Sequence, residues 1–345
     1  MSPLRHPVGT PAGPRRGPTG AGGAAGRPGR ERRIRRPGEE AVSFYSAGLE
    51  LRGVLYRPAP PRSGPAPAVV LCHGFTAVKE LYLPPFARSL AAAGFAALAF
   101  DCRGFGESQG PPGRLIPDEQ VEDVRQALTF LESRPDVDGR RMALFGTSFG
   151  GGIAVAAAAR DPRARAVVSS VGVSDGERWL RGMRPYWEWV EFRRRVEQDR
   201  RARVLRGTSE WVERDTIAPP DPAAAAAHRA AGRLVPGRRV RLPLESADAI
   251  MEFKPESLVD RLSPRPLLVV VAGEDRRVPP EEGYRLFERA GEPKRLVELP
   301  GAGHHDVYES PVRDRLLDVV REWLTLHLTR PAGTGRPRRG PGGGR

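Results

Sequence analysis

The chain has little lysine, little cysteine and no long apolar run. Only three of its 56 basic residues are lysines (Lys79, Lys254 and Lys294), as the codon usage of a GC-rich genome would produce. Its two cysteines, Cys72 and Cys102, are too few for a disulfide framework. No stretch approaches the roughly 18 apolar residues that cross a bilayer, and no signal peptide pattern is visible. We therefore expect a cytoplasmic protein with free thiols and no membrane partner.

The net charge of +14 is concentrated at the two ends of the chain. Residues 1–38 carry nine arginines and one glutamate, and residues 330–345 carry five arginines and no acid, so the remainder is close to neutral. A nearly neutral core lacks the positive surface that binds a nucleic-acid backbone. Both ends are rich in glycine and proline and poor in large apolar residues, which predicts two disordered basic tails.

Two kinds of cofactor site are also missing from the sequence. No group of histidine, cysteine and aspartate has the spacing of a metal site, and no G-x-G-x-x-G loop follows a predicted strand. We therefore expect neither a metal nor a nucleotide cofactor.

Short apolar runs alternate with helical segments between the tails. The run at 68–72 is continuously apolar, which is typical of a strand covered on both faces. We expect strands at 42–44, 49–56, 68–72, 95–100, 142–145, 166–171, 266–271 and 295–298, and helices at 85–93, 117–132, 151–159, 280–290 and 312–328. This alternation predicts an α/β fold with a mostly parallel eight-stranded sheet flanked by helices.

The segment 174–250 interrupts the alternation. It holds four of the five tryptophans and reads as a mostly helical cap inserted between two parts of the core, 39–173 and 251–329. Substrate pockets are largely apolar, so Trp179 and Trp187 are candidates for contact with a substrate. The alternative is that these aromatic side chains only pack the cap onto the core.

A G-x-S-x-G pentapeptide, Gly146–Gly150, lies between a predicted strand and a predicted helix. A sharp turn at that place would hold the Ser148 hydroxyl out of its surroundings, and its glycines would remove Cβ atoms that clash there. The pentapeptide is weak evidence alone. Its position between strand and helix makes Ser148 a candidate nucleophile.

A serine nucleophile needs a base and an acid that orients the base. Glu274 and Asp275 follow one predicted strand, and His304 and His305 follow the next. The carboxyl ends of parallel strands meet at one edge of the sheet, where open α/β folds place their sites. The order serine, acid, histidine is that of one class of serine hydrolases.

Four further segments resemble motifs of the α/β-hydrolase superfamily of serine hydrolases. They are His73–Thr76, similar to an H-G-x oxyanion loop; Asp101–Ser108, similar to D-x-R-G-x-G-x-S; Ala272–Pro279, similar to G-x-D-x-x-V-P; and Gly301–His304, similar to G-x-G-H. The resemblance covers about residues 42–329. It is closest to the dienelactone-hydrolase-like and serine-aminopeptidase-like branch with a helical cap.

The resemblance implies a role for five residues. Ser148 would be the nucleophile, Asp275 rather than Glu274 the acid, and His304 rather than His305 the base. The backbone N–H groups of Phe75 and Phe149 would form the oxyanion hole.

Three functions are compatible with these residues. The first is hydrolysis of a carboxylic ester or thioester of a small-molecule acyl substrate through an acyl-serine. The second uses the same triad on an amide, as an aminopeptidase does, or on a C–C bond. The third is a non-catalytic binding protein that keeps the fold. The oligomeric state is not predicted.

Overall fold

The computed structural model describes residues 38–58, 64–234 and 240–329. The two tails predicted to be disordered, 1–38 and 330–345, lie outside the described residues apart from Gly38.

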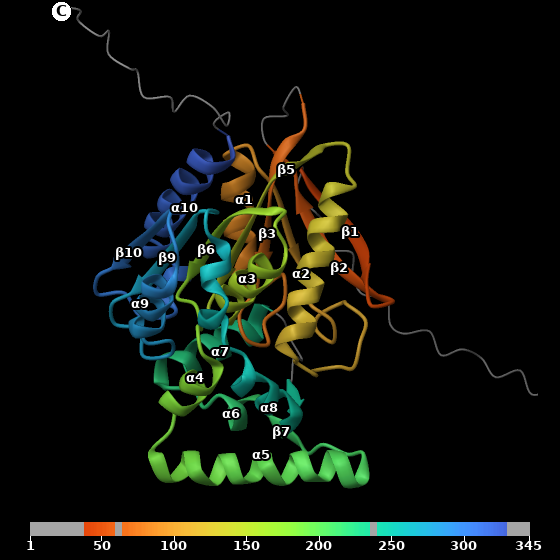
Figure 1. Ribbon diagram of the computed structural model, residues 1–345, viewed down its shortest axis with the longest axis vertical. Helices are drawn as coiled ribbons and strands as arrows, with labels where there is room; N and C mark the ends of the chain where they lie inside the picture. The colour runs from red at the N-terminus through yellow and green to blue at the C-terminus, as the bar shows by residue number, and fades with distance from the viewer. Residues whose placement is uncertain (1–37, 59–63, 235–239, 330–345) are drawn as a thin grey trace, which may run out of the picture. The chain divides into compact units, whose positions relative to one another are not determined.

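An eight-stranded sheet forms the centre of the described chain (Figure 1). Its strands are β1 (Glu39–Ser46), β2 (Leu49–Tyr56), β3 (Ala66–Cys72), β4 (Ala96–Phe100), β5 (Val137–Thr147), β6 (Ala164–Ser170), β9 (Leu267–Ala272) and β10 (Lys294–Leu299). Their order in the sheet is β1-β2-β4-β3-β5-β6-β9-β10. β2 pairs antiparallel with β1 and β4, and all other pairs are parallel. The predicted mostly parallel sheet is confirmed.

Helices cover both faces of this sheet and bury an apolar layer on each. α2 (Pro117–Glu132), α3 (Phe149–Arg160) and α9 (Pro280–Arg289) pack on one face, and α1 (Leu83–Ala92) and α10 (Val312–Leu328) pack on the other. Every residue of β3, β4 and β9 is buried, which explains their continuous apolar sequence.

The first turns of α2 and α9 carry proline and acidic residues. Pro117 begins α2 and is followed by Asp118 and Glu119, and α9 begins in the same way at Pro280. Proline at the first helical position needs no N–H partner, and carboxylates favour the positive end of the helix dipole.

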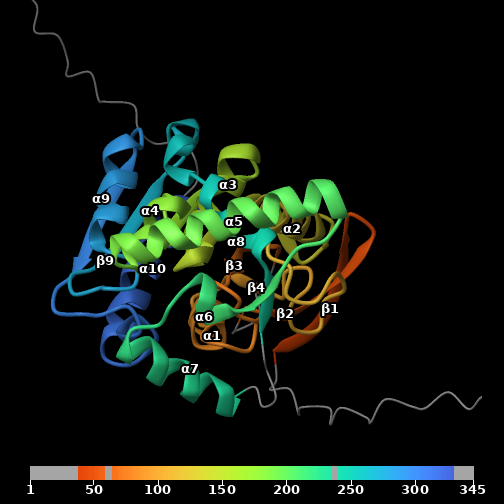
Figure 2. The ribbon, with the colours of Figure 1, turned by 90° about the horizontal axis from the view of Figure 1, so that it is seen from below.

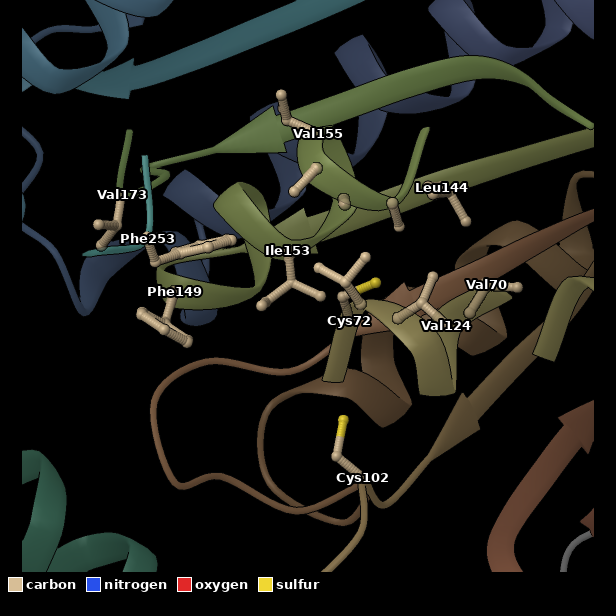
Figure 3. Close-up of a cluster of buried hydrophobic side chains, with 14 of the residues drawn as sticks. Val70, Cys72, Cys102, Val124, Leu144, Phe149, Ile153, Val155, Val173 and Phe253 are labelled. Atoms are coloured by element: carbon tan, nitrogen blue, oxygen red, sulfur yellow. The ribbon is translucent and has the colours of Figure 1, made fainter. Parts of the chain in front are cut away.

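The α3 side of the core lies directly behind the candidate nucleophile. Ile153 of α3 lies beside Cys72 of β3, and Phe149 lies against Phe253 (Figure 3). This packing fixes the start of α3 relative to the carboxyl ends of the strands.

A second set of elements lies between β6 and β9 of the chain. They are α4 (Gly176–Gly182), α5 (Tyr186–Arg206), β7 (Trp211–Glu213), α6 (Arg214–Ile217), α7 (Pro222–Leu234), β8 (Arg241–Pro243) and α8 (Leu244–Glu252). They fall in the segment predicted as a cap, apart from the last two residues of α8. Short 3₁₀ turns follow at Pro255–Ser257 and Val259–Leu262, and another lies at Asp306–Tyr308.

α5 is the outermost element of this set. α4, α6 and α8 lie between it and the sheet, and α7 lies at one side (Figures 1 and 2). α5 buries Trp189, Phe192 and Val196 on its inner face and ends at Gly207, which adopts a left-handed conformation. Among the described residues, no helix is long and apolar enough to cross a membrane.

Candidate active site

Ser148 lies at a tight turn between β5 and α3. Its backbone has φ +56° and ψ −129°, a conformation that residues other than glycine rarely adopt. A Cβ atom on Gly146 would lie 1.9 Å from the Gly150 carbonyl oxygen, and one on Gly150 would lie 2.3 Å from the Cys72 carbonyl oxygen. Both glycines are therefore required by close backbone approach, as the pentapeptide predicted. The turn places the Ser148 side chain at the carboxyl edge of the sheet.

His304 connects Ser148 to Asp275. The His304 Nε2 atom lies 3.0 Å from Ser148 Oγ, and its Nδ1 atom lies 2.6 Å from Asp275 Oδ2. All three residues are at least 91% buried. The structure thus brings together the serine, base and acid that the sequence named, with hydrogen-bond contacts at both nitrogens of one imidazole.

The loop after β9 holds the Asp275 carboxylate in place. Asp275 Oδ1 accepts hydrogen bonds from the backbone N–H groups of Arg277 (2.8 Å) and Val278 (2.7 Å). The carboxylate therefore has hydrogen-bond contacts at both oxygens, which fix its direction.

The two alternative residues do not take part in this chain of contacts. Glu274 is exposed, and both ring nitrogens of His305 lack a hydrogen-bond partner among the described residues. Asp306 instead accepts a hydrogen bond from the Gly303 N–H (2.7 Å), so it shapes the loop that carries His304.

The segment after β3 passes beside Ser148. A Cβ atom built on Gly74 would lie 3.3 Å from Ser148 Cβ, so the backbone here runs in contact with the serine. The Phe75 ring packs edge-on against Phe149 (6.1 Å between ring centres) and Trp179 (5.5 Å). Phe75 and Phe149 are therefore adjacent to Ser148, as expected, from two different elements.

A buried lysine that the sequence analysis did not single out anchors this segment. Lys79 is 2% exposed, and its Nζ atom lies 2.6 Å from Asp101, 2.8 Å from Glu107 and 2.8 Å from Glu80. The Lys79 N–H also donates to Asp101 Oδ1 (2.7 Å), and the Glu107 N–H donates to Asp101 Oδ2 (2.9 Å). Asp101 thereby ties the loop after β3 to the loop after β4.

The three carboxylates around Lys79 are close enough together to hold a metal ion, since one oxygen of each lies within 4.8 Å of the others. The ammonium group of Lys79 already contacts all three, so its charge fills the place that a cation would take. A signal was available in the sequence: Lys79 is one of only three lysines in an arginine-rich chain.

A small cavity of about 70 Å³ opens beside Ser148. Its lining comes from the segment between β3 and α1, the turn after β5, the loops of the acid and the base, and the elements between β6 and β9. The residues are 74–77, 81–83, Thr147, Ser148, Trp179, Arg214, His228, Arg277, His304, His305 and Tyr308. The volume is below the ~300–1,000 Å³ usual for ligand sites, so in this conformation it admits only a small group.

The two tryptophans proposed as substrate contacts lie in different places. Trp179 lines the cavity, is 2% exposed, and donates a hydrogen bond from Nε1 to the Arg277 carbonyl (3.0 Å). Trp187 is 62% exposed on α5 and does not line the cavity, so the expectation for Trp187 is corrected. The face of α5 that packs inward carries Trp189 instead.

A larger groove of about 660 Å³ runs along α5, but none of Ser148, Asp275 and His304 lines it.

The sequence profile of one protein family matches most of the chain. The family described as serine aminopeptidase, S33, matches residues 63–311. That range contains the turn at Ser148, the loop of Asp275 and the loop of His304.

Known proteins of similar sequence and structure agree with this match. The chain is 32% identical to a 31.7 kDa protein from the traX-finO intergenic region of Escherichia coli, over 76% of this chain and 91% of that protein. It is 31% identical to a thiohydrolase of Eupenicillium brefeldianum, over 84% of this chain and 92% of that protein. The crystal structure of the α/β hydrolase GrgF from Penicillium sp. sh18 superposes with a TM-score of 0.72 at 27% identity, over 85% and 99% of the two chains. The chain therefore belongs to the serine aminopeptidase S33 family and is an α/β hydrolase.

Proposed function

We propose that this enzyme hydrolyses a carboxylic ester or thioester of a small-molecule acyl substrate through an acyl-serine intermediate. The observation that carries the proposal is the pair of contacts from His304, 3.0 Å to Ser148 Oγ and 2.6 Å to Asp275 Oδ2. A serine hydroxyl is a weak nucleophile until a neighbouring base takes its proton, and this arrangement supplies the base and its orienting acid.

The first half of the reaction forms the acyl-serine. Ser148 Oγ attacks the acyl carbon while His304 Nε2 takes the hydroxyl proton, which gives a tetrahedral intermediate with a negative oxygen. His304 then passes that proton to the leaving alcohol or thiol as its bond to carbon breaks. Asp275 stabilises the imidazolium that exists between these two transfers.

The second half releases the acid. Water attacks the acyl-serine carbon, His304 takes a proton from the water, and the same proton returns to Ser148 Oγ when the ester bond breaks. The products are a carboxylic acid and the free serine, and no cofactor is consumed.

The backbone N–H groups of Phe75 and Phe149 are the proposed donors to the negative oxygen. Phe149 is the first residue of α3, where N–H groups point out of the helix and the dipole favours negative charge. The Phe75 N–H has no hydrogen-bond partner among the described residues and belongs to the segment in contact with Ser148. Loss of one such donor typically costs about 3 kcal/mol of transition-state stabilisation.

An amidase or aminopeptidase activity of the same residues is the second candidate, favoured by the description of the matching family. The similarity to a thiohydrolase supports the inclusion of thioesters in the first. The predicted cytoplasmic location stays a prediction.

A substrate panel separates the two candidates. It contains p-nitrophenyl esters of increasing chain length, acyl thioesters of N-acetylcysteamine, and aminoacyl anilides, each assayed with the wild type and with Ser148→Ala. We expect turnover of esters or thioesters that disappears in Ser148→Ala. Turnover of the anilides alone would favour the amidase or aminopeptidase over the ester or thioester hydrolase. Ester turnover equal in the wild type and in Ser148→Ala would refute Ser148 as the nucleophile of either activity.

A further inference from the structure

Two arginines and two histidines line the cavity beside Ser148. They are Arg214, Arg277, His228 and His305, and no carboxylate lines it among the described residues. Arg214 is paired with Asp215 (2.7 Å) just outside the lining. Arg277 comes from the loop of the acid, His305 from the loop of the base, and Arg214 and His228 from α6 and α7. Three separate parts of the chain therefore bring nitrogen donors to one small space.

Arg277 is a buried cation that forms no ion pair with any described residue. It is 7% exposed, and its guanidinium donates to the carbonyl oxygens of Ala218 (3.2 Å) and Pro219. No carboxylate oxygen of the described residues lies within 4.0 Å of the Arg277 guanidinium, the distance of an ion pair. Burial and the charge of Arg214 lower the pKa of Arg277 to about 10, against the opposite effect of three carboxylates at longer range, Asp221, Asp215 and Asp275, so the side chain stays charged at neutral pH. Buried charges in proteins are normally paired, and an unpaired one favours binding of an anion.

The two histidines are neutral donors in the same space. Burial lowers the pKa of His228 to about 3 and that of His305 to about 4, with Arg277 acting in the same direction on both. Both ring nitrogens of His305 are buried and have no hydrogen-bond partner in the described part of the chain, and His228 Nδ1 faces the guanidinium of Arg214. A neutral imidazole offers one N–H, so each ring can add a hydrogen bond to an anion held by the arginines.

Much of the remaining lining of the cavity is apolar or aromatic. It includes Phe75, Leu81, Leu83, Trp179 and Tyr308, which would contact the hydrocarbon part of a ligand. A short apolar group that carries an anionic oxygen suits this mixed lining, and a carboxylate matches the planar, two-donor edge of a guanidinium.

We propose that Arg277, assisted by Arg214, His228 and His305, binds a carboxylate on the substrate close to the scissile carbonyl. The enzyme would then select carboxylate-bearing esters or thioesters over neutral ones of similar size. This proposal rests on the proposed hydrolase activity, and it names the substrate class for the same site. The competing explanation is structural, because Arg277 also connects the acid loop to two carbonyls near α7, and a neutral donor could do that equally well.

Two matched substrate pairs test the proposal and locate the carboxylate. The first pair differs on the acyl side: the p-nitrophenyl monoester of glutarate and its methyl ester. The second differs on the leaving-group side: the butyrate ester of para-hydroxybenzoate and that of methyl para-hydroxybenzoate. The readout is the ratio of kcat/KM for the charged substrate to that for the neutral one, measured for the wild type, Arg277→Gln, Arg214→Gln and Arg276→Gln.

We expect a ratio of about ten- to hundredfold in at least one pair, the range of one hydrogen bond to a charged group. Arg277→Gln keeps a side-chain donor but loses the charge, so the ratio should fall by about tenfold or more, while Arg214→Gln should lower it less. Arg276 is the adjacent exposed arginine outside the cavity, and Arg276→Gln should keep the wild-type ratio. If Arg277→Gln fails to fold, the test rests on Arg214→Gln: a lower ratio of kcat/KM for charged over neutral substrate supports the proposal, and an unchanged ratio refutes it.

The failure of this proposal is distinct from failure of the proposed function. If neutral esters are hydrolysed with dependence on Ser148 and neither pair shows a preference, the carboxylate site is refuted and the hydrolase stands. A preference that survives in both Arg277→Gln and Arg214→Gln also refutes it. If Ser148 is neither acylated by any substrate nor phosphonylated by a fluorophosphonate, the hydrolase proposal fails first.

Discussion

Replacement of Lys79 by methionine should destabilise the fold strongly, because it removes a buried cation and leaves its anions in place. Lys79 is 2% exposed and Asp101 is 0% exposed, with 2.6 Å between Nζ and Oδ2. The side chains of Glu80 and Glu107 are 30% and 43% exposed, so they can turn toward solvent, whereas Asp101 cannot. Removal of one partner of a buried pair costs about 3–5 kcal/mol. Asp101 keeps two backbone donors, so we expect the lower end of this range.

The assay is urea unfolding at pH 7 of the wild type, Lys79→Met and the matched control Lys254→Met. Lys254 is 41% exposed and lies 3.5 Å from Asp175 and Glu177, so its loss should cost about 0–1 kcal/mol. A cost for Lys79→Met no larger than that of Lys254→Met would refute the reasoning.

Three further predictions follow from the geometry of the site. Gly150→Ala should abolish labelling of the serine by a fluorophosphonate, since its Cβ would lie 2.3 Å from a carbonyl oxygen of β3, whereas Gly182→Ala meets no atom within 4 Å and should label normally. His304→Ala should slow acylation by about 10³-fold or more and His305→Ala by less than tenfold, and the reverse order in stopped-flow burst kinetics would move the base by one residue. The pKa values of His228 and His305 are lowered by folding, so the unfolded chain binds more protons than the folded protein between about pH 4 and 6.5. The free energy of unfolding should therefore rise with pH across that window, by up to about 1.4 kcal/mol per pH unit for each histidine. Replacement of both histidines by glutamine should reduce this pH dependence in urea titrations, and an unchanged pH dependence would contradict the prediction.

The sheet could be predicted from sequence because strands buried on both faces must be apolar throughout. The run at 68–72 became β3, and the apolar stretch ending at Phe145 became part of β5. The bounds differed where polar residues extend a strand: β5 begins at Val137, five residues before the predicted start, and includes two arginines and an aspartate.

The position of Ser148, Asp275 and His304 was predictable because each follows a strand of one parallel sheet. What local pattern could not supply was the side of a helix that packs inward. Trp187 and Trp189 are two residues apart on α5, and only packing against α8 decides that Trp189 is buried. The helix α7 was expected only as part of a mostly helical cap, whereas the structure shows that its His228 lines the cavity beside Ser148.

The ion cluster around Lys79 was missed for a related reason. Its members come from positions 79, 80, 101 and 107, in loops after two adjacent strands, and no spacing rule in the sequence relates them. Their proximity arises only when β3 and β4 pair side by side in the sheet.

Covalent labelling of the intact protein tests the central claim most directly. A fluorophosphonate is added to the wild type, Ser148→Ala and Asp275→Asn, and the adduct is located by peptide mass spectrometry. We predict one adduct, on the peptide that contains Ser148, at a rate reduced by orders of magnitude in Asp275→Asn and with no adduct in Ser148→Ala. An adduct on another residue, or equal labelling of Ser148→Ala, would contradict the assignment of Ser148 as the nucleophile.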